Sequence, residues 1–289
     1  MKLSGMHLLL TYECNFECDH CFVWGSPRQP GAMSPEQIRE ILEQSKRLGT
    51  VEWIYFEGGE PFLYYAALLE GARLAAEAGF DVGLVTNAYW ATSAEDALRW
   101  LEGLGPVQLL HVSSDDLHHG GDPEALARVD HAVAAAERLD IEVSTLRVEP
   151  GDVMFRGRAV DKLTPGLARR PAATFDTCPH ETLDAPTRVH VDPPGFVQVC
   201  QGITIGNVFE TPLREVVRRY EPASHPIVGP LLRGGPCALA HALEVDVDAS
   251  DGYVDACHLC FLARRDARSR GLAHLEPAIV YGSQESRGP

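Results

Sequence analysis

The chain has 289 residues, of which 45% are apolar, and this size and composition predict packed domains rather than disorder. Its formal charge of −16 argues against nucleic acid or an anionic membrane as a partner held by overall charge. No apolar run approaches the roughly 20 residues of a membrane span, and polar residues interrupt any N-terminal signal sequence. We therefore expect a cytoplasmic protein, whose eight cysteines are metal ligands or catalytic groups rather than disulfides.

Short apolar runs alternate with helix-like segments in the first half of the chain. We expect strands at 6–11, 51–56, 81–86, 107–113 and 141–148, and helices at 34–49, 64–78, 93–104 and 123–139. Such alternation predicts parallel strands joined by right-handed crossovers, in an open doubly wound sheet or a full or partial barrel. In either fold, functional residues should lie at the C-terminal ends of the strands.

The pattern changes after about residue 150. Residues 151–173 are rich in arginine, glycine and proline, and beyond them cysteines are frequent and strands short. We expect one domain at 1–173 and a second, small α+β domain at 174–289, with a hairpin at 189–199. A cluster of arginines near the C-terminus predicts a solvated helix face: Arg264, Arg265, Arg268 and Arg270.

Three cysteines follow the first expected strand within eight residues. Cys14, Cys18 and Cys21 can converge on one metal centre. Iron–sulfur clusters normally take four thiolates, so three would leave one iron open to bind another ligand. Zinc is the main alternative, with His20 as its fourth ligand.

The same residues resemble a known family. The run 14–21 is similar to the CxxxCxxC signature of radical S-adenosylmethionine (radical SAM) enzymes, and 56–61 is similar to their GGEP segment. The resemblance implies a partial (β/α)6 TIM-like barrel and a [4Fe–4S] cluster held by Cys14, Cys18 and Cys21. It also implies that S-adenosylmethionine chelates the fourth iron and is cleaved to a 5′-deoxyadenosyl radical, which abstracts hydrogen from a substrate.

The resemblance extends to residues that would bind the cofactor. It assigns this role to Gly58, Gly59, Glu60, Asn87, Ser113, Asp115 and Arg147. An ordinary Gly-Gly turn, a capped turn and a surface arginine are the alternatives for these segments. In the loop 115–119, Asp116 and His118 are candidates for the general base, and a solvated surface loop is the alternative.

The distal cysteines resemble those of SPASM and twitch domains, which carry auxiliary clusters. A full SPASM pattern has seven cysteines, whereas this region has five, so the resemblance implies one auxiliary [4Fe–4S] cluster. We expect its ligands to be Cys178, Cys200, Cys257 and Cys260. Cys237 is left over as a free thiol, a substrate-facing group or a replacement ligand, and a zinc site on the same four cysteines is the alternative.

The implied reaction is hydrogen abstraction, with the auxiliary cluster accepting an electron. An external donor such as flavodoxin or ferredoxin would reduce the first cluster. Relatives of this kind modify peptides or dehydrogenate and rearrange small molecules such as aminocyclitols, and we slightly favour peptide modification. The chain starts 13 residues before Cys14, so we expect no N-terminal peptide-recognition domain. A non-catalytic zinc or iron–sulfur scaffold is the alternative from another class.

Overall fold

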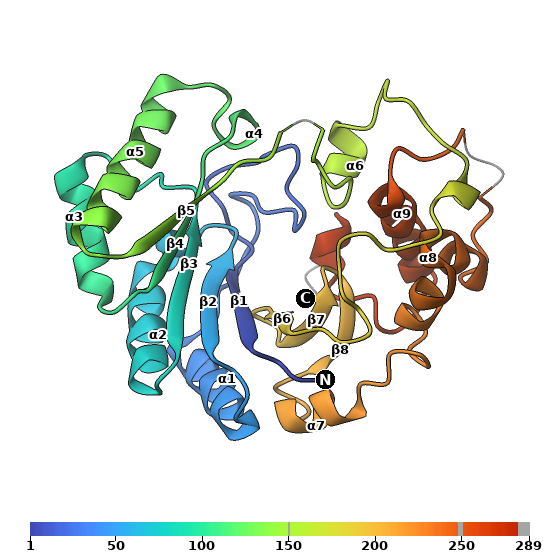
Figure 1. Cartoon of the computed structure of the whole chain (residues 1–289), viewed down its shortest axis with the longest axis horizontal. Helices are drawn as coiled ribbons and strands as arrows, with labels where there is room; N and C mark the ends of the chain where they lie inside the picture. Colours follow the sequence, from blue (N-terminus) through green and yellow to red (C-terminus); the bar gives the residue numbers. More distant parts are fainter. Residues whose placement is uncertain (150, 248–250, 283–289) are drawn as a thin grey trace, which may run out of the picture.

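The computed structural model describes residues 1–149, 151–247 and 251–282, which share one eight-stranded sheet (Figure 1). Its strand order is β5-β4-β3-β2-β1-β6-β7-β8. The strands are β1 (Gly5–Thr11), β2 (Trp53–Gly58), β3 (Asp81–Thr86), β4 (Leu109–Ser113), β5 (Glu142–Leu146), β6 (Arg188–Val191), β7 (Phe196–Cys200) and β8 (Ile203–Asn207). Strands β1 to β6 run parallel, and β7 and β8 continue the sheet in antiparallel pairs.

The helices connect these strands as the alternating pattern predicts. They are α1 (Pro35–Leu48), α2 (Tyr65–Glu77), α3 (Ala94–Leu104), α4 (Asp116–His119), α5 (Pro123–Arg138), α6 (Ala159–Lys162), α7 (Leu213–Arg219), α8 (Val228–Ala242) and α9 (Ala256–Ser269). Short 3-10 helices are η1 (Pro61–Tyr64), η2 (Ala172–Thr174) and η3 (Ala278–Tyr281). Every helix in the described part of the chain is too short or too polar to cross a bilayer.

The predicted α/β class is confirmed, and the sheet does not close into a barrel. Helices α1, α2, α3 and α5 lie together on one side of the parallel strands, whereas α8 and α9 lie across from them and α7 packs beside α1 (Figure 1). The four residues of α6 are the longest α-helix between β5 and β6 among the described residues. The last crossover therefore lacks the long helix that the first four have.

The sheet continues across the domain boundary expected at residue 173. Strand β6 pairs in parallel with β1, from Gly5 opposite Arg188 to Leu8 opposite Val191. The hairpin expected at 189–199 is confirmed by the antiparallel pairing of β6 and β7. The division at 173 stays a prediction, and the two parts share one sheet.

A buried carboxylate joins β1 to this hairpin. Asp192 accepts hydrogen bonds from the Tyr12 hydroxyl at 3.0 Å, the Gln198 amide at 3.2 Å and the Phe196 backbone N–H at 2.8 Å. Its side chain is fully buried, and burial raises its pKa to about 7. The folded state therefore binds this proton more tightly than the unfolded chain does.

We expect this carboxyl group to make stability fall as pH rises. The stabilisation is complete below the ordinary pKa of 3.8 and is lost as pH passes the folded value of about 7. Relative to an Asp192→Asn variant, the wild type should lose at most about 4 kcal/mol between pH 4 and pH 8, by the free energy of one pKa unit. Urea unfolding of both proteins across this range measures the difference, with the exposed Asp130→Asn as control. A constant difference would contradict the prediction.

Candidate functional site

The three N-terminal cysteines lie on the loop that leaves β1. Cys14 is buried, and Cys18 and Cys21 are partly buried. Backbone N–H groups point at two of the sulfurs: Phe16 donates to Cys14 Sγ at 3.4 Å and Gly25 to Cys21 Sγ at 3.2 Å. Such donors stabilise negatively charged sulfur, as cluster thiolates require.

Burial favours the protonated form of two of these thiols, those of Cys14 and Cys18. It raises the pKa values of Cys14 and Cys18 to about 12 each. Metal binding at neutral pH must therefore release protons from the loop.

The two glycines after β2 press against this loop. Gly59 donates its N–H to the Thr11 carbonyl at 2.7 Å, and a Cβ on Gly59 would lie 2.0 Å from the Glu13 carbonyl oxygen. Gly58 has a φ of +140°, and its Cβ would lie 2.3 Å from the Thr11 carbonyl. Neither position has room for a side chain, which explains the Gly-Gly pair by packing.

Glu60 faces the protein interior rather than the cavity. It is fully buried, and its carboxylate accepts from Phe62 N–H at 3.1 Å, the Thr86 hydroxyl at 2.8 Å and Asn87 N–H at 2.8 Å. Burial raises its pKa to about 7. The structure thus gives Glu60 the task of fixing the end of β3 beside the loop after β2.

A cavity of about 260 Å³ opens where the strands end. It is lined by predicted residues from four strand ends: Cys14, Cys18, Cys21, Gly58, Gly59, Asn87, Ser113 and His118. Asn87 is tied to the cysteine loop through Asn15 Oδ1 at 2.9 Å and also approaches Cys14 Sγ at 3.7 Å. The expected gathering of motifs at the carboxyl ends of the strands is present.

The loop after β4 holds a carboxylate–imidazole pair. Asp115 caps α4, and its carboxylate lies 2.9 Å from His118 Nδ1 and 3.1 Å from the Val148 N–H. Burial opposes ionisation of Asp115, but His118 and the backbone donors lower its pKa to about 2. His118 lines the cavity, whereas Asp116, the other predicted base, is exposed.

Arg147 does not join this group. Strand β5 ends one residue earlier, and the Arg147 side chain is 66% exposed and pairs with Glu149 at 3.0 Å. It is absent from the described lining of the cavity. The sequence placed Arg147 near the end of a strand, but it could not show that the side chain points to solvent.

Arg158 also holds the cysteine loop in place, and no local sequence pattern indicated it. Arg158 is buried and donates to the carbonyl oxygens of Cys18 at 2.8 Å and Gly25 at 2.7 Å. Its own N–H donates to the Cys21 carbonyl at 2.9 Å. Its guanidinium lies 5.3 Å from the ring centroid of Trp24. One side chain thus fixes both ends of the loop.

We expect Arg158→Lys to loosen this loop. Lysine keeps the charge, but its single ammonium cannot reproduce the two-pronged contact, so stability should fall by about 2–3 kcal/mol. Iron should also leave the reconstituted protein faster when a chelator is added. The exposed Arg219→Lys is the matched control. Chelation kinetics and unfolding curves identical to wild type would refute this role for Arg158.

The four distal cysteines chosen as ligands meet at a second, small cavity. Cys178, Cys200, Cys257 and Cys260 all line it. Burial raises the pKa values of Cys200, Cys257 and Cys260, in the last case to about 11. Cys237 is outside the described lining; its N–H donates to the Phe175 carbonyl at 3.0 Å.

Two buried arginines surround this second cavity. Arg156 lines both cavities and lies 3.6 Å from Cys200 Sγ and 3.4 Å from a Glu181 oxygen. Arg264 donates to the Gln201 carbonyl at 2.8 Å and is 2% exposed. The predicted solvated helix face is therefore wrong for Arg264, because α9 turns this residue toward the cysteines. Both cations favour negatively charged sulfur nearby.

The N-terminal part of the chain matches a known family model. Residues 8–119 match the model described as the Radical SAM superfamily. This segment includes all three N-terminal cysteines, the glycine pair and the loop to His119. The match agrees with the resemblance of the two sequence motifs to that family, whose members use a [4Fe–4S] cluster and S-adenosylmethionine.

Individual relatives match parts of the chain. YydG of Bacillus subtilis, described provisionally as a peptide biosynthesis protein, is 30% identical over 111 residues, 38% of this chain and 35% of YydG. The tungsten-containing aldehyde ferredoxin oxidoreductase cofactor-modifying protein of Pyrococcus furiosus is 30% identical over 173 residues, 58% of this chain and 48% of that protein. The matched regions thus span between a third and a half of these relatives.

A solved structure shares the fold over a larger part of the chain. BtrN in complex with AdoMet (S-adenosylmethionine) and 2-DOIA superposes with a TM-score of 0.53 at 21% identity. The match covers 75% of this chain and 82% of BtrN. It supports the open TIM-like α/β fold.

Proposed function

We propose that this chain is a radical SAM enzyme that abstracts hydrogen from a peptide and passes one electron to an auxiliary cluster. The observation that carries the proposal is the single cavity lined by Cys14, Cys18, Cys21, the glycine pair, Asn87 and His118. Backbone N–H groups already point at two of the cysteine sulfurs, so the loop fits an anionic cluster. When bound, the cluster and S-adenosylmethionine would supply a 5′-deoxyadenosyl radical.

The chain's own residues then have separate tasks. The three cysteines would hold the cluster, and the backbone of Gly58 and Gly59, with Asn87 and Ser113, would bind S-adenosylmethionine along the strand ends. Arg158 would keep the loop in place. His118, oriented by Asp115 at 2.9 Å, is placed to accept a substrate proton at the cavity wall. We propose His118 as the base in preference to the exposed Asp116.

The distal cysteines would hold the auxiliary [4Fe–4S] cluster. Four thiolates line one small cavity, and Arg156 lies between it and the radical cavity. Full ligation would leave no open iron, which suits electron transfer better than substrate binding. An external donor such as flavodoxin or ferredoxin would reduce the first cluster. Zinc on the same four thiolates is the competing outcome.

Peptide is the proposed substrate class, and the partial similarity to YydG supports it. A small molecule as substrate is the competing outcome. Peptides encoded beside the gene are the first substrates to test, with mass spectrometry to detect loss of hydrogen or a new cross-link. Turnover of a small molecule, with every such peptide unchanged, would reject the peptide assignment.

Anaerobic reconstitution tests the enzyme class itself. Protein reduced with dithionite in the presence of S-adenosylmethionine should release 5′-deoxyadenosine. Iron and sulfide should each reach about eight per chain, as two four-iron clusters require. About four iron and four sulfide per chain, together with bound zinc, would mean that the distal cysteines hold zinc rather than an auxiliary cluster. No 5′-deoxyadenosine from fully loaded protein would favour a non-catalytic scaffold instead.

A further inference from the structure

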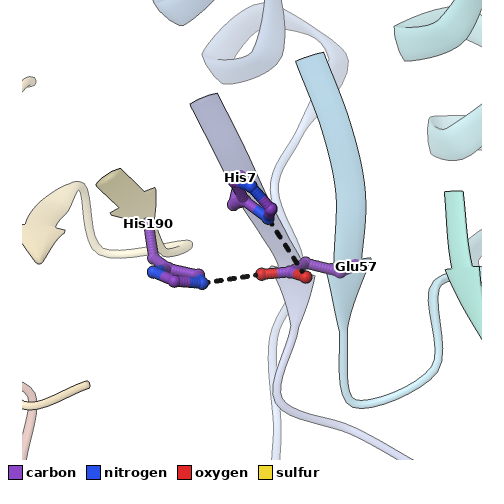
Figure 2. A group of neighbouring side chains, drawn as sticks. All are labelled: His7, Glu57 and His190. Atoms are coloured by element: carbon purple, nitrogen blue, oxygen red, sulfur yellow. Dashed lines mark ion pairs between the residues drawn. The ribbon is translucent and has the colours of Figure 1, made fainter. Parts of the chain in front are cut away.

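Three side chains of the kinds that bind metals meet on one face of the sheet, and none of them is a cysteine. His7, Glu57 and His190 come from β1, β2 and β6, which are neighbours in the sheet. His7 pairs in register with His190 on β6 and with Tyr55 on β2, and Glu57 lies two residues beyond Tyr55, opposite Leu9. Both imidazoles point at the Glu57 carboxylate, and each contacts a different oxygen (Figure 2). One nitrogen or oxygen from each residue lies within 4.8 Å of the other two.

The distances match the edges of a metal coordination sphere. His7 Nδ1 lies 3.4 Å from Glu57 Oε2, and His190 Nε2 lies 3.2 Å from Glu57 Oε1. Charge-assisted hydrogen bonds are shorter, about 2.7–2.9 Å. Ligands that each bind one metal at about 2.0–2.2 Å are separated by roughly 3.0–3.5 Å.

The polar atoms of the trio are buried without adequate hydrogen bonds. Glu57 and His190 are each 9% exposed. Apart from these ion-pair contacts, the buried atoms His7 Nδ1 and Glu57 Oε1 have no hydrogen-bond partner in the part of the chain that the structure describes. A buried carboxylate with an unsatisfied oxygen is costly, and a cation shared by the three residues would remove this cost.

Neighbouring groups hold the two imidazoles in place. The Tyr55 ring stacks on His7, with centroids 4.5 Å apart and planes 13° apart. The buried Gln201 amide lies beside His190, with its nitrogen 3.4 Å from Nε2, and a metal ion on Nε2 would replace this contact.

We propose that His7, Glu57 and His190 form a mononuclear site for a divalent transition metal such as Zn²⁺ or Fe²⁺. Two imidazoles and one carboxylate suit these ions. Three protein ligands leave coordination positions open to water or to oxygen atoms of a substrate. Glu57 also lines the cavity that holds Cys14, so the site would adjoin the proposed radical centre. The site does not depend on the reaction proposed above.

Zinc analysis of the cluster-loaded protein tests this site. Reconstituted wild-type protein, dialysed against Zn²⁺ and desalted, should retain about one zinc per chain beyond its iron. Glu57→Gln and His190→Gln should each lose most of that zinc and keep their iron. The matched control is His111→Gln, because His111 lies near Tyr55 on the same face but outside the trio. Equal zinc in wild type and Glu57→Gln would overturn the proposal.

A spectroscopic measurement on wild-type protein covers the case in which a variant fails to fold. Co²⁺ bound at this site in cluster-loaded protein should give X-ray absorption with nitrogen and oxygen neighbours and no sulfur neighbour. Sulfur neighbours would place the ion on the cysteines and reject the site. Loss of zinc in the variants with iron retained separates this result from a failure of the proposed function, which the 5′-deoxyadenosine assay measures.

Discussion

Replacing Cys18 by alanine is expected to abolish cleavage of S-adenosylmethionine. Cys18 lines the cavity with Cys14 and Cys21, and two thiolates cannot hold the site that three are proposed to hold. Iron should fall by about half, from about eight to about four per chain, because the auxiliary cluster keeps its ligands. 5′-Deoxyadenosine should fall to the background of the assay. Iron and sulfide analysis with chromatography of the reaction products measures both results.

Cys237→Ala is the matched control for this experiment. Its thiol is as partly buried as that of Cys18 but lies outside the described linings of both cavities. We expect unchanged iron and unchanged cleavage in this variant. A Cys18→Ala protein with full iron and full cleavage would refute the proposed cluster site. Loss of about four irons from Cys237→Ala would place Cys237 among the auxiliary ligands.

Local patterns predicted the parts of the molecule that local forces determine. The strand at 81–86 is found at those residues, and α1 begins after Ser34, whose hydroxyl accepts from Gln37 N–H as expected of an N-cap. The N-terminal cysteines could also be predicted as a group, because all three lie within one loop. The glycine pair could be predicted as part of a site because it lies within one short motif. The sequence did not show that the Thr11 and Glu13 carbonyls leave no room for side chains there.

The missed residues act over long sequence separations. Arg158 contacts Cys18 and Gly25, which are 140 and 133 residues away, and no nearby spacing indicates such a contact. Gly157 is similar, since its Cβ would lie 2.5 Å from the Cys21 carbonyl. The segment 151–173, for which the sequence showed only a high content of arginine, glycine and proline, therefore contributes to both cavities. Side-chain direction was equally hidden, as Arg147 points to solvent.

The group of His7, Glu57 and His190 could not be predicted either, because it too joins residues that are far apart in the sequence. His7 and His190 become neighbours only because β6 pairs with β1 rather than forming a separate sheet. The expected boundary at residue 173 assigns His7 and His190 to different domains, and nothing in the sequence indicated that their strands pair. Register between distant strands depends on which hydrophobic faces pack together, and a single sequence does not state it.

Removing the auxiliary site is expected to separate cofactor cleavage from product formation. In the double variant Cys257→Ala/Cys260→Ala, two of the four thiolates at the second cavity are lost, so iron should again fall by about half. Cleavage should continue, because the N-terminal loop and Arg158 are unchanged. Product should disappear, since the substrate radical has no acceptor for its electron. Parallel assays of 5′-deoxyadenosine and modified peptide measure the two steps.

The position of Arg156 shows that the two cavities adjoin, which bears on how the double variant is interpreted. Arg156 lines both cavities and lies 3.6 Å from Cys200 Sγ, so one side chain contributes to the walls of both sites. A cluster in the second cavity would therefore adjoin the radical cavity, as an electron acceptor requires. A zinc ion there would contribute to stability alone. Loss of zinc instead of iron, with product formation retained, would contradict the redox role. Loss of both activities with iron retained at the first site would mean that the second site supports the first cavity structurally.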